Sequence, residues 1–395
     1  MKIIVVGTGF SGSIMARKIV DEFDCEVDLF EKRANIAGNM FDYVDEHGIL
    51  IQKYGPHFVN TNKYWIIDYL SKYAEMIPHN CHLLSFIDNH YVQLPFNFTS
   101  LQQLVGAKES ESIMSELRFE FKGRDRVPMF ELLHSQNDGV KSFANLLFDK
   151  AFRTYSSKQW GIPIEKIDKS VIDRVQFCIG YDSRFLNKDY QYLPKNGFTQ
   201  LFSNMLNHPK IHLHLNSDAN DHISFVDGRV LFDNELVDLI VYTGAIDELF
   251  RCKYGRLPYR TIQFKYDYYK CDKKLPSEIV SYPQAIGFTR STEYKQFTFD
   301  CDNKTDTVVV TEFPHDYNPF DPEKNTPCYP VINRENIDLY KLYKKEADKY
   351  DNLFLCGRLA EYKYYNMDLV IESTFEKYEI VKRRIKKCRM LSKTL

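Results

Sequence analysis

The sequence predicts an α/β fold in which a doubly wound parallel-sheet domain is interrupted by a helical insertion and an antiparallel β-sheet insertion. A β-branched run at 3–6 leads directly into glycines, as buried parallel strands of such domains do. Residues 98–175 keep helical periodicity with charged faces, and residues 255–315 alternate aromatic side chains with threonines. These three segments indicate one layered domain with two insertions of different character.

The elements of the doubly wound domain are spread along the chain. After the first strand, apolar residues recur at helical spacing between 14 and 20, and residues 26–30 form a second strand that ends at Glu31. A helix is expected around 200–206 and a strand ending at 238–244, and residues 352–357 precede a long C-terminal helix. We therefore assign residues 1–82, 197–246 and 349–395 to the discontinuous domain, residues 98–175 to the helical domain, and residues 83–97, 176–196 and 247–348 to an antiparallel-sheet domain that binds substrate.

Composition and charge exclude several classes of function. With 52 lysines and arginines against 54 acidic residues, the net charge of −2 gives no reason to expect a nucleic-acid partner. No apolar run approaches the ~18–20 residues of a membrane helix, so no integral membrane association is expected. The nine cysteines stand singly and are odd in number. That pattern favours free thiols in a reducing compartment, and a cytoplasmic location is expected.

One short segment carries metal-ligand residue types. It is His79-Asn80-Cys81-His82. The sequence shows no second pair of ligands beside it, so no metal site is predicted.

A glycine-rich loop gives the first indication of chemistry. Gly7-x-Gly9-x-x-Gly12 follows a strand, opens a helix and precedes Glu31, 24 positions after Gly7. In this context the glycines form a dinucleotide-binding fingerprint: the first permits a tight turn, the second lets the backbone approach a pyrophosphate, and the third allows close helix–strand packing. Glu31 would accept hydrogen bonds from a ribose diol, and the helix N-terminus would attract the pyrophosphate.

FAD is the cofactor that these features favour. A flavoenzyme that also binds NADPH on a Rossmann module usually has two such fingerprints, and this chain has one. Strand-to-glycine junctions also occur far downstream, at Thr243-Gly244 and at Gly357-Arg358. An extended FAD across a discontinuous domain accounts for all three junctions. The predicted fold is thus a Rossmann-like FAD-binding domain with a helical insertion and an antiparallel β-sheet insertion.

Several segments, in order over nearly the whole chain, resemble bacterial UDP-galactopyranose mutases. They are Glu31-Lys-Arg-x-x-Ile-Ala-Gly-Asn39, Tyr54-Gly-Pro-His57, Leu94-Pro-Phe-Asn97, Tyr155-x-x-Lys-Gln-Trp-Gly161, Pro194-x-x-Gly-Phe-Thr199, Tyr242-Thr-Gly-x-Ile-Asp247, Tyr329-Pro-Val331 and Gly357-Arg-Leu-Ala-Glu-Tyr-Lys-Tyr-Tyr365. The resemblance implies an isomerase that interconverts UDP-galactopyranose and UDP-galactofuranose. In that reaction the reduced FAD attacks the anomeric carbon through N5, without net redox change. It also implies a homodimer and a role in polysaccharide biosynthesis.

The resemblance also implies roles for individual residues. The catalytic residues would be His57 beside the flavin, Arg260 near the reduced flavin, and Arg290 and Arg358 on phosphates. The cofactor-binding residues would be Gly7, Gly9, Phe10, Ser11, Gly12, Glu31, Lys32, Gly38, Asn39, His57, Thr243, Gly244, Gly357, Arg358, Asn366 and Met367. The residues that bind the nucleotide-sugar substrate would be Asn97, Tyr155, Trp160, Arg184, Phe185, Arg290, Tyr329 and Tyr364.

The chain departs from the family pattern mainly on the sugar-diphosphate side. Asn60 stands where the family has a second histidine, and Cys178 where it has its main diphosphate arginine. Asn366 replaces an aspartate, Phe185 replaces a tyrosine, and on the flavin side Ala37 replaces a glycine. Loss of one charged hydrogen-bonding partner costs about 1.5–3 kcal/mol. Arg184, six residues after Cys178, is our candidate replacement.

Three readings of the function stay open. The first is a UDP-galactopyranose mutase with compensated contacts. The second is the same ring contraction on another nucleotide sugar, such as UDP-GalNAc, dTDP-fucose or another NDP-hexose. The third is a flavin oxidoreductase acting on an amine or an alcohol. The FAD motifs permit the third, but the segments 158–161 and 357–365 do not favour it.

Overall fold

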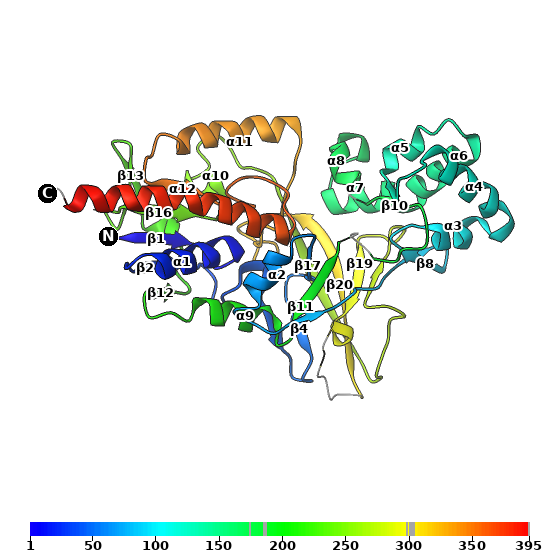
Figure 1. The fold of residues 1–395 in the computed structure, drawn as a ribbon, viewed down its shortest axis with the longest axis horizontal. Helices are drawn as coiled ribbons and strands as arrows, with labels where there is room; N and C mark the ends of the chain where they lie inside the picture. Colours follow the sequence, from blue (N-terminus) through cyan, green and yellow to red (C-terminus); the bar gives the residue numbers. More distant parts are fainter. Residues whose placement is uncertain (174, 185–187, 298, 300–304, 394–395) are drawn as a thin grey trace.

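A five-stranded parallel sheet organises the part of the chain that holds the glycine-rich loop. The structure is a computed structural model, and it describes residues 1–173, 175–184, 188–297, 299 and 305–393 (Figure 1). The strand order is β12-β2-β1-β16-β22, with every pairing parallel. The bounds are β1 Ile3–Val6, β2 Val27–Phe30, β12 Ile211–His214, β16 Leu239–Tyr242 and β22 Leu353–Leu355. This order confirms the predicted Rossmann-like α/β fold.

Helices cover both faces of this sheet because side chains alternate along β1. Ile3 and Val5 pack into a cluster with α1 (Phe10–Glu22) and the long C-terminal α12 (Met367–Lys393). Ile4 faces the other way and packs into a cluster with α10 (Ile246–Leu249) and α11 (Arg334–Ala347). An antiparallel sheet of β13 (Ile223–Val226), β14 (Arg229–Phe232) and β15 (Glu235–Leu236) joins that second cluster. The central strands β1 and β16 are therefore buried on both faces, as their apolar composition predicts.

The second large sheet has seven strands and lies beside the first (Figure 1). Its order is β21-β17-β20-β19-β18-β7-β8, and all its pairings are antiparallel except that of β7 with β18. The bounds are β7 Leu83–Ile87, β8 His90–Leu94, β17 Tyr259–Tyr269, β18 Ile279–Ser281, β19 Arg290–Glu293, β20 Thr307–Asp316 and β21 Tyr329–Pro330. The alternating aromatic residues of 259–269 thus form one long strand of this sheet.

Helices occupy the end of the molecule opposite both chain termini (Figure 1). They are α3 (Phe98–Val105), α4 (Ala107–Glu120), α5 (Met129–Leu133), α6 (Asp138–Leu147), the π-helix η2 (Phe148–Arg153), α7 (Thr154–Trp160), the 3₁₀ helix η3 (Ile164–Lys166) and α8 (Lys169–Ile172). Asn97 begins α3 with a capping box: its side chain accepts from the Ser100 backbone N–H, and Ser100 Oγ accepts from the Asn97 N–H. The two-stranded pair β9 (Arg126–Val127) and β10 (Phe177–Cys178) closes this region.

Two segments lie elsewhere than we expected. In 176–196, β10 pairs with β9, and β11 (Tyr190–Pro194) pairs with β5 (Val59–Thr61) and β6 (Met76–Pro78). These strands belong to small separate sheets because their partners, β9 on one side and β5 and β6 on the other, lie in the helical region and in the region of the nucleotide loop. In 247–348, α11 packs on the parallel sheet through Tyr343 and Ala347, since an amphipathic helix buries its apolar stripe on the nearest open sheet face.

The remaining elements complete the connections between these layers. They are α2 (Tyr64–Leu70), α9 (Gly197–Leu206), the antiparallel pair β3 (Asp42–Val44) and β4 (Leu50–Gln52), and the 3₁₀ helices η1 (Gly38–Met40), η4 (Ala219–Asp221) and η5 (Tyr294–Phe297). Among the described residues, no helix is both long and apolar enough to cross a membrane.

Candidate functional site

A cavity of about 360 Å³ lies at the carboxyl ends of the parallel strands. Its wall is built from the turns after β1, β2, β12, β16 and β22, which the parallel order brings to one edge of the sheet. The predicted residues that line it are Gly7, Gly9, Phe10, Ser11, Glu31, Lys32, Gly38, Asn39, His57, Thr243, Gly244, Arg290, Tyr329, Gly357, Arg358, Tyr364, Asn366 and Met367. Residues more than 300 positions apart thus meet at one site.

The glycine-rich loop has the geometry that the fingerprint requires. Gly7 has φ +94°, which only glycine adopts without strain. A Cβ on Gly12 would lie 1.8 Å from the Gly7 carbonyl oxygen, so the helix can approach the strand this closely only with glycine there. A Cβ on Gly9 would meet no described atom within 4 Å, because Gly9 faces the cavity. The loop therefore leaves room beside the N-terminus of α1.

Glu31 lies at the end of β2 and is held in place by the loop. Its carboxylate accepts from the Thr8 backbone N–H at 3.0 Å and from Thr8 Oγ1 at 2.7 Å, and its other oxygen accepts from the Arg33 N–H at 3.0 Å. Arg33 Nη2 donates to Asn39 Oδ1 at 3.0 Å, while Arg33 Nη1 is buried without a partner among the described residues. A buried, unpartnered guanidinium nitrogen on a cavity wall fits an oxygen-rich ligand.

The downstream junctions close the cavity wall. Thr243 Oγ1 donates to the Val6 carbonyl oxygen at 2.6 Å, which ties β16 to the end of β1. Gly357 has φ +95°, and a Cβ there would lie 2.7 Å from Ser11 Oγ. Asn366 and Met367, at the N-terminus of α12, line the same cavity. The close approach to Ser11 explains why glycine follows β22.

Ala37 departs from the family glycine in a position that favours glycine. Its backbone has φ +74° and its side chain is fully buried. Left-handed backbone costs a non-glycine residue about 1–2 kcal/mol. The next residue, Gly38, approaches Gly9 so closely that a Cβ would lie 3.0 Å from the Gly9 Cα. The strained turn therefore holds Gly38 against the nucleotide loop.

His57 faces the cavity as a neutral imidazole. Its Nδ1 lies 2.7 Å from the Gly55 carbonyl oxygen, so Nδ1 carries the proton and Nε2 is left as an acceptor. Burial, followed by the charge of Arg358, lowers the pKa of His57 to about 3, against the opposing hydrogen bond to Gly55. At neutral pH this ring can accept a hydrogen bond from a ligand but adds no positive charge.

Two further arginines of the cavity, Arg290 and Arg358, are oriented by different partners. Arg290 begins β19 and pairs across the sheet with Glu312 of β20, and its Nε donates to Glu312 Oε1 at 2.7 Å. Burial alone would lower the pKa of Arg290, but the Glu312 carboxylate raises it above the usual range, so the side chain stays a cation. Arg358 lies over the Tyr329 ring, 5.1 Å from its centroid. Glu312 holds Nε of Arg290, and the same guanidinium lines the cavity, where a ligand can contact it.

An aromatic cluster adjoins these arginines. Tyr329 and Tyr364 lie 5.5 Å apart, and the buried Trp160 lies 5.5 Å from Tyr364 and 6.2 Å from Tyr329, measured between ring centroids. Both tyrosines line the cavity, whereas Trp160 supports them from behind. Burial raises the pKa of Tyr329, so its phenol stays protonated and can donate a hydrogen bond.

Arg260 lies behind the cavity and holds the end of α7. Its Nε donates to the Gln159 carbonyl oxygen at 2.9 Å and its Nη2 to the Lys158 carbonyl oxygen at 3.1 Å, while Asp316 pairs with Nη1. A cation on the last carbonyls of a helix also suits its dipole. Gly161 has φ +68°, and a Cβ there would lie 2.2 Å from Arg260 Nη1. The segment Lys158–Gly161 is thus built around this guanidinium.

Lys158 is a positioning residue that sequence reasoning missed, although it stands in a quoted motif. Its ammonium donates to three backbone carbonyls, those of Tyr282 at 2.8 Å, Ala285 at 2.7 Å and Phe288 at 2.8 Å. These carbonyls belong to the loop that leads into Arg290. The Lys-Gln-Trp-Gly segment therefore fixes that loop through its lysine and the aromatic cluster through its tryptophan.

Besides Trp160 and Arg260, five predicted site residues lie outside the cavity wall or outside the described chain. Asn97 is fully buried as the cap of α3, and its amide also donates to the Asp182 carbonyl oxygen at 3.1 Å. Gly12 lies beneath the loop. Tyr155 is on α7, near enough to Arg290 to raise the pKa of its guanidinium. Arg184 is exposed and pairs with Asp182 at 3.0 Å. Phe185 falls outside the described residues.

Two further residues were not assigned to the site from the sequence. Asn60, in the family's histidine position, lines the cavity, and its buried Oδ1 has no partner among the described residues. Arg126, on β9, stands directly opposite Cys178 in the β9–β10 ladder. Its Nη2 donates to the Arg184 carbonyl oxygen at 2.7 Å and pairs with Asp182 at 3.4 Å. Strand pairing alone reveals this arginine, because it lies 52 positions before Cys178 in the sequence.

The cavity fits an extended dinucleotide such as FAD. The open space at Gly9, the backbone N–H groups of α1 without a side-chain cap, the anchored Glu31 and the unpartnered Arg33 Nη1 supply the contacts of a pyrophosphate and a ribose. The arginines and tyrosines of the same cavity supply contacts for a second, diphosphate-bearing ligand. One cavity therefore brings together contacts suited to both kinds of ligand.

Comparison with known proteins adds independent evidence. The UDP-galactopyranose mutase family model matches residues 150–364, and an NAD(P)-binding Rossmann-like domain model matches residues 5–73. A UDP-galactopyranose mutase from Mycoplasma genitalium is 34% identical over 95% of this chain and 93% of its own. A dTDP-fucopyranose mutase from Escherichia coli is 29% identical over 95% of this chain and 97% of its own.

Solved structures support the same fold. A reduced UDP-galactopyranose mutase superposes with a TM-score of 0.70 at 15% identity, covering 96% of this chain and 93% of its own. A putrescine oxidase superposes with a TM-score of 0.61 at 10% identity, covering 97% and 99%. At these identities the likeness concerns the fold alone.

Proposed function

This chain belongs to the UDP-galactopyranose mutase family, and from that premise we propose that it interconverts UDP-galactopyranose and UDP-galactofuranose with reduced FAD. The enzyme is an isomerase of the pyranose–furanose mutase type. One observation carries the proposal: a single cavity joins the nucleotide loop to two arginines and two tyrosines suited to a sugar diphosphate.

The residues at the carboxyl ends of the strands hold the cofactor. When bound in its reduced form, FAD supplies the nucleophile for a ring contraction without net redox change. The N-terminus of α1 binds the pyrophosphate, and Glu31 accepts hydrogen bonds from a ribose. His57 offers Nε2 as an acceptor, and its neutrality leaves the positive charge of the site to the arginines.

Arg290 and Arg358 bind the diphosphate of the sugar nucleotide and stabilise the negative charge that develops when the anomeric bond breaks. Tyr329 and Tyr364 donate hydrogen bonds to the same oxygens. Trp160 keeps both rings in place, and Lys158 keeps the loop before Arg290 in place. Positioning and charge stabilisation are thus the tasks of the chain's own residues.

A second candidate function is the same reaction on another nucleotide sugar. The unpartnered Asn60 Oδ1 in the cavity favours it. An amide oxygen in place of the family's imidazole changes the shape of the pocket and the hydrogen bonds that it offers to the sugar. The arginine position taken by Cys178 points the same way, since Cys178 is buried and carries no charge for a phosphate. The candidates are UDP-GalNAc and dTDP-fucose.

The test is a chromatographic assay of UDP-galactofuranose conversion to UDP-galactopyranose, with and without dithionite. Turnover in the reduced sample alone is the expected result. A variant tests the role of the arginine. Arg358→Lys keeps the positive charge but loses the two-pronged hydrogen bonding of the guanidinium, and should lower kcat/KM by roughly tenfold or more. If FAD-loaded, reduced protein leaves UDP-galactofuranose unchanged but converts UDP-GalNAc or dTDP-fucose, the second candidate replaces the first.

The biological setting follows from the family and from the cysteine pattern. We propose a cytoplasmic homodimer that supplies a furanose donor for polysaccharide synthesis. The eight described cysteines are free thiols, which supports a reducing compartment. Sedimentation of the FAD-loaded protein tests the dimer, and a monomer at micromolar concentration would remove that part of the proposal.

A further inference from the structure

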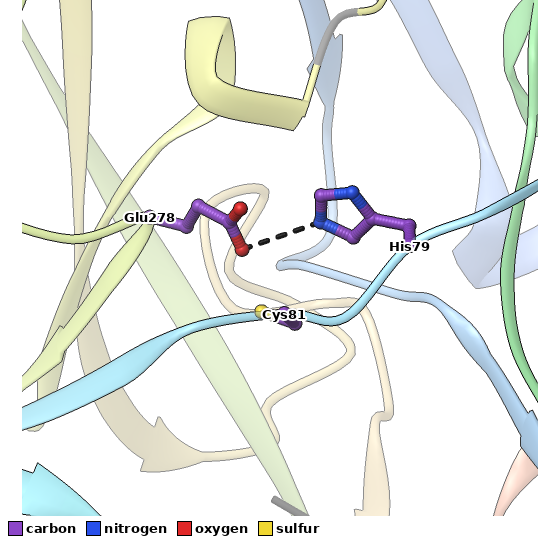
Figure 2. A group of neighbouring side chains, drawn as sticks. All are labelled: His79, Cys81 and Glu278. Atoms are coloured by element: carbon purple, nitrogen blue, oxygen red, sulfur yellow. Dashed lines mark hydrogen bonds and ion pairs between the residues drawn. The ribbon is translucent and has the colours of Figure 1, made fainter. Parts of the chain in front are cut away.

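Three side chains of metal-ligand type meet behind the cavity. His79 and Cys81 lie on the segment between β6 and β7, and Glu278 lies just before β18. Figure 2 shows the Glu278 carboxylate facing the His79 imidazole, with the Cys81 thiol beside this pair. Their ligand atoms all lie within 4.8 Å of one another. The sequence showed only the first two, because Glu278 is 199 positions from His79.

We propose that His79, Cys81 and Glu278 form a zinc site. Imidazole nitrogen, thiolate sulfur and carboxylate oxygen are the three donor types that Zn²⁺ takes in proteins. Their separations in a tetrahedral zinc site are about 3.3–3.8 Å, from metal–ligand distances of about 2.0–2.3 Å. His79 Nε2 and Glu278 Oε2 already lie 3.3 Å apart, and with all three ligand atoms within 4.8 Å of one another, the sulfur would have to move closer to complete the site.

The charges of the site match this ion. A thiolate and a carboxylate together neutralise Zn²⁺, with a neutral histidine as third ligand and a water molecule in the fourth position. On binding, the Cys81 proton leaves to solvent as the Zn–S bond forms. Cys81 is 2% exposed and Glu278 is 8% exposed, so without a metal two acidic groups share a buried site.

The surroundings hold the ligands in place. The His82 backbone N–H donates to Glu278 Oε2 at 3.0 Å, and Ser277 Oγ donates to the His82 carbonyl oxygen at 2.6 Å. The His79 ring packs against Phe297, 5.7 Å between centroids. Such contacts orient metal ligands from outside the coordination sphere.

The ion would clamp two strands that form part of the cavity wall. Leu83 of β7 and Ile279 of β18 are direct partners in the parallel ladder, and both line the cavity. Glu278 immediately precedes Ile279, and Cys81 lies two residues before Leu83. Zinc at this point would fix that pair to the segment that follows β6. The role is structural, beside the reacting groups and apart from them.

The first experiment titrates the FAD-loaded wild-type protein with Co²⁺, which reports its coordination by colour. We expect one equivalent to give the intense visible bands of tetrahedral Co²⁺ with a thiolate ligand, at longer wavelength than oxidised flavin, and Zn²⁺ to abolish them. A spectrum that stays that of aqueous Co²⁺ would overturn the proposal and leave the three groups as a hydrogen-bonded cluster. This titration needs no variant.

The second experiment measures bound zinc and thermal stability. Wild-type protein dialysed against Zn²⁺ and then desalted should retain about one zinc per chain and unfold at a higher Tm than metal-free protein. Cys81→Ser and His79→Gln should lose both effects, whereas Cys25→Ser and His212→Gln, which change a cysteine and a histidine outside the site, should keep them. FAD content reports whether each variant folds. Zinc retained by folded Cys81→Ser protein would overturn the assignment.

Discussion

Replacing Gly161 by alanine should disturb the site through Arg260, without touching a ligand. A Cβ at this position would lie 2.2 Å from Arg260 Nη1 and 2.7 Å from its Cζ, so the guanidinium must move. Moving it breaks the hydrogen bonds to the carbonyls of Gln159 and Lys158. The end of α7 and the Trp160 ring would then lose their anchor.

The expected cost has two parts. Residue 161 has φ +68°, and a left-handed backbone costs alanine about 1–2 kcal/mol relative to glycine. Losing at least one of the two charged hydrogen bonds adds about 1.5–3 kcal/mol. Gly161→Ala should therefore lower the free energy of unfolding by about 2.5–5 kcal/mol.

Gly48 provides the matched control. It has φ +76°, and a Cβ there would meet no described atom within 4 Å. Gly48→Ala should cost only the backbone part, about 1–2 kcal/mol. Urea unfolding of both variants measures the difference, and KM for the nucleotide sugar should rise only in Gly161→Ala, because only there do Trp160 and the tyrosines it supports shift.

A double-mutant cycle with Arg260→Met gives the decisive result. In that background Gly161→Ala should cost no more than Gly48→Ala, since there is no guanidinium left to displace. If Gly161→Ala lowers the free energy of unfolding no more than Gly48→Ala when Arg260 is present, then residue 161 is not packed against the Arg260 guanidinium as described.

Three other predictions concern the cavity itself. His57 has a folded pKa of about 3 against an ordinary value of 6.5, so the unfolded state binds more protons in between and stability falls as pH drops. Between pH 6.5 and about pH 4.5, this group should lower the free energy of unfolding by about 2–3 kcal/mol, and His57→Gln should lack this loss. Equal acid sensitivity of both proteins in urea unfolding would contradict this. Gly9→Ala should fold normally but bind FAD at least tenfold more weakly by fluorescence titration, and unchanged affinity would mean that the open space is not the cofactor's. Asn60→Ala should lower kcat/KM by roughly 2- to 13-fold at unchanged FAD content, as expected for one hydrogen bond. Unchanged kcat/KM would remove Asn60 from the substrate pocket.

Much of the fold could be predicted because its signals are local. The strand, glycine turn and helix of residues 3–22 are written in adjacent residues, and so is the long aromatic strand at 259–269. The helix at 334–347 was missed because its mean hydropathy is low and its few buried residues, such as Tyr343, lie among charged ones. The partners of residues 190–194 could not be predicted, since short strands carry no local mark of which neighbours they will choose.

The candidate site was predictable to the extent that it depends on turns and motifs. Positions that need a positive φ can be recognised because glycine occupies them, and Arg358 directly follows one such glycine, Gly357. What the sequence conceals is the side to which a long side chain turns. Arg260 reaches back to α7, and Glu278 reaches a histidine 199 positions away. Such long-range side-chain contacts depend on which strands pair, and the local sequence pattern does not show that.

The assembly of the cavity sets an order of events during synthesis. Its wall needs Gly7 and Glu31, but also Gly357 and Val370, which lie more than 300 residues further along the chain. A nascent chain on the ribosome therefore carries the glycine-rich loop without the other half of the binding site until those residues have been added. Cofactor capture must wait until the strand at 353–355 adds itself to the edge of the sheet. Flavin uptake therefore requires residues 353–357 as well as the glycine-rich loop, and chains that stop before Gly357 should remain colourless.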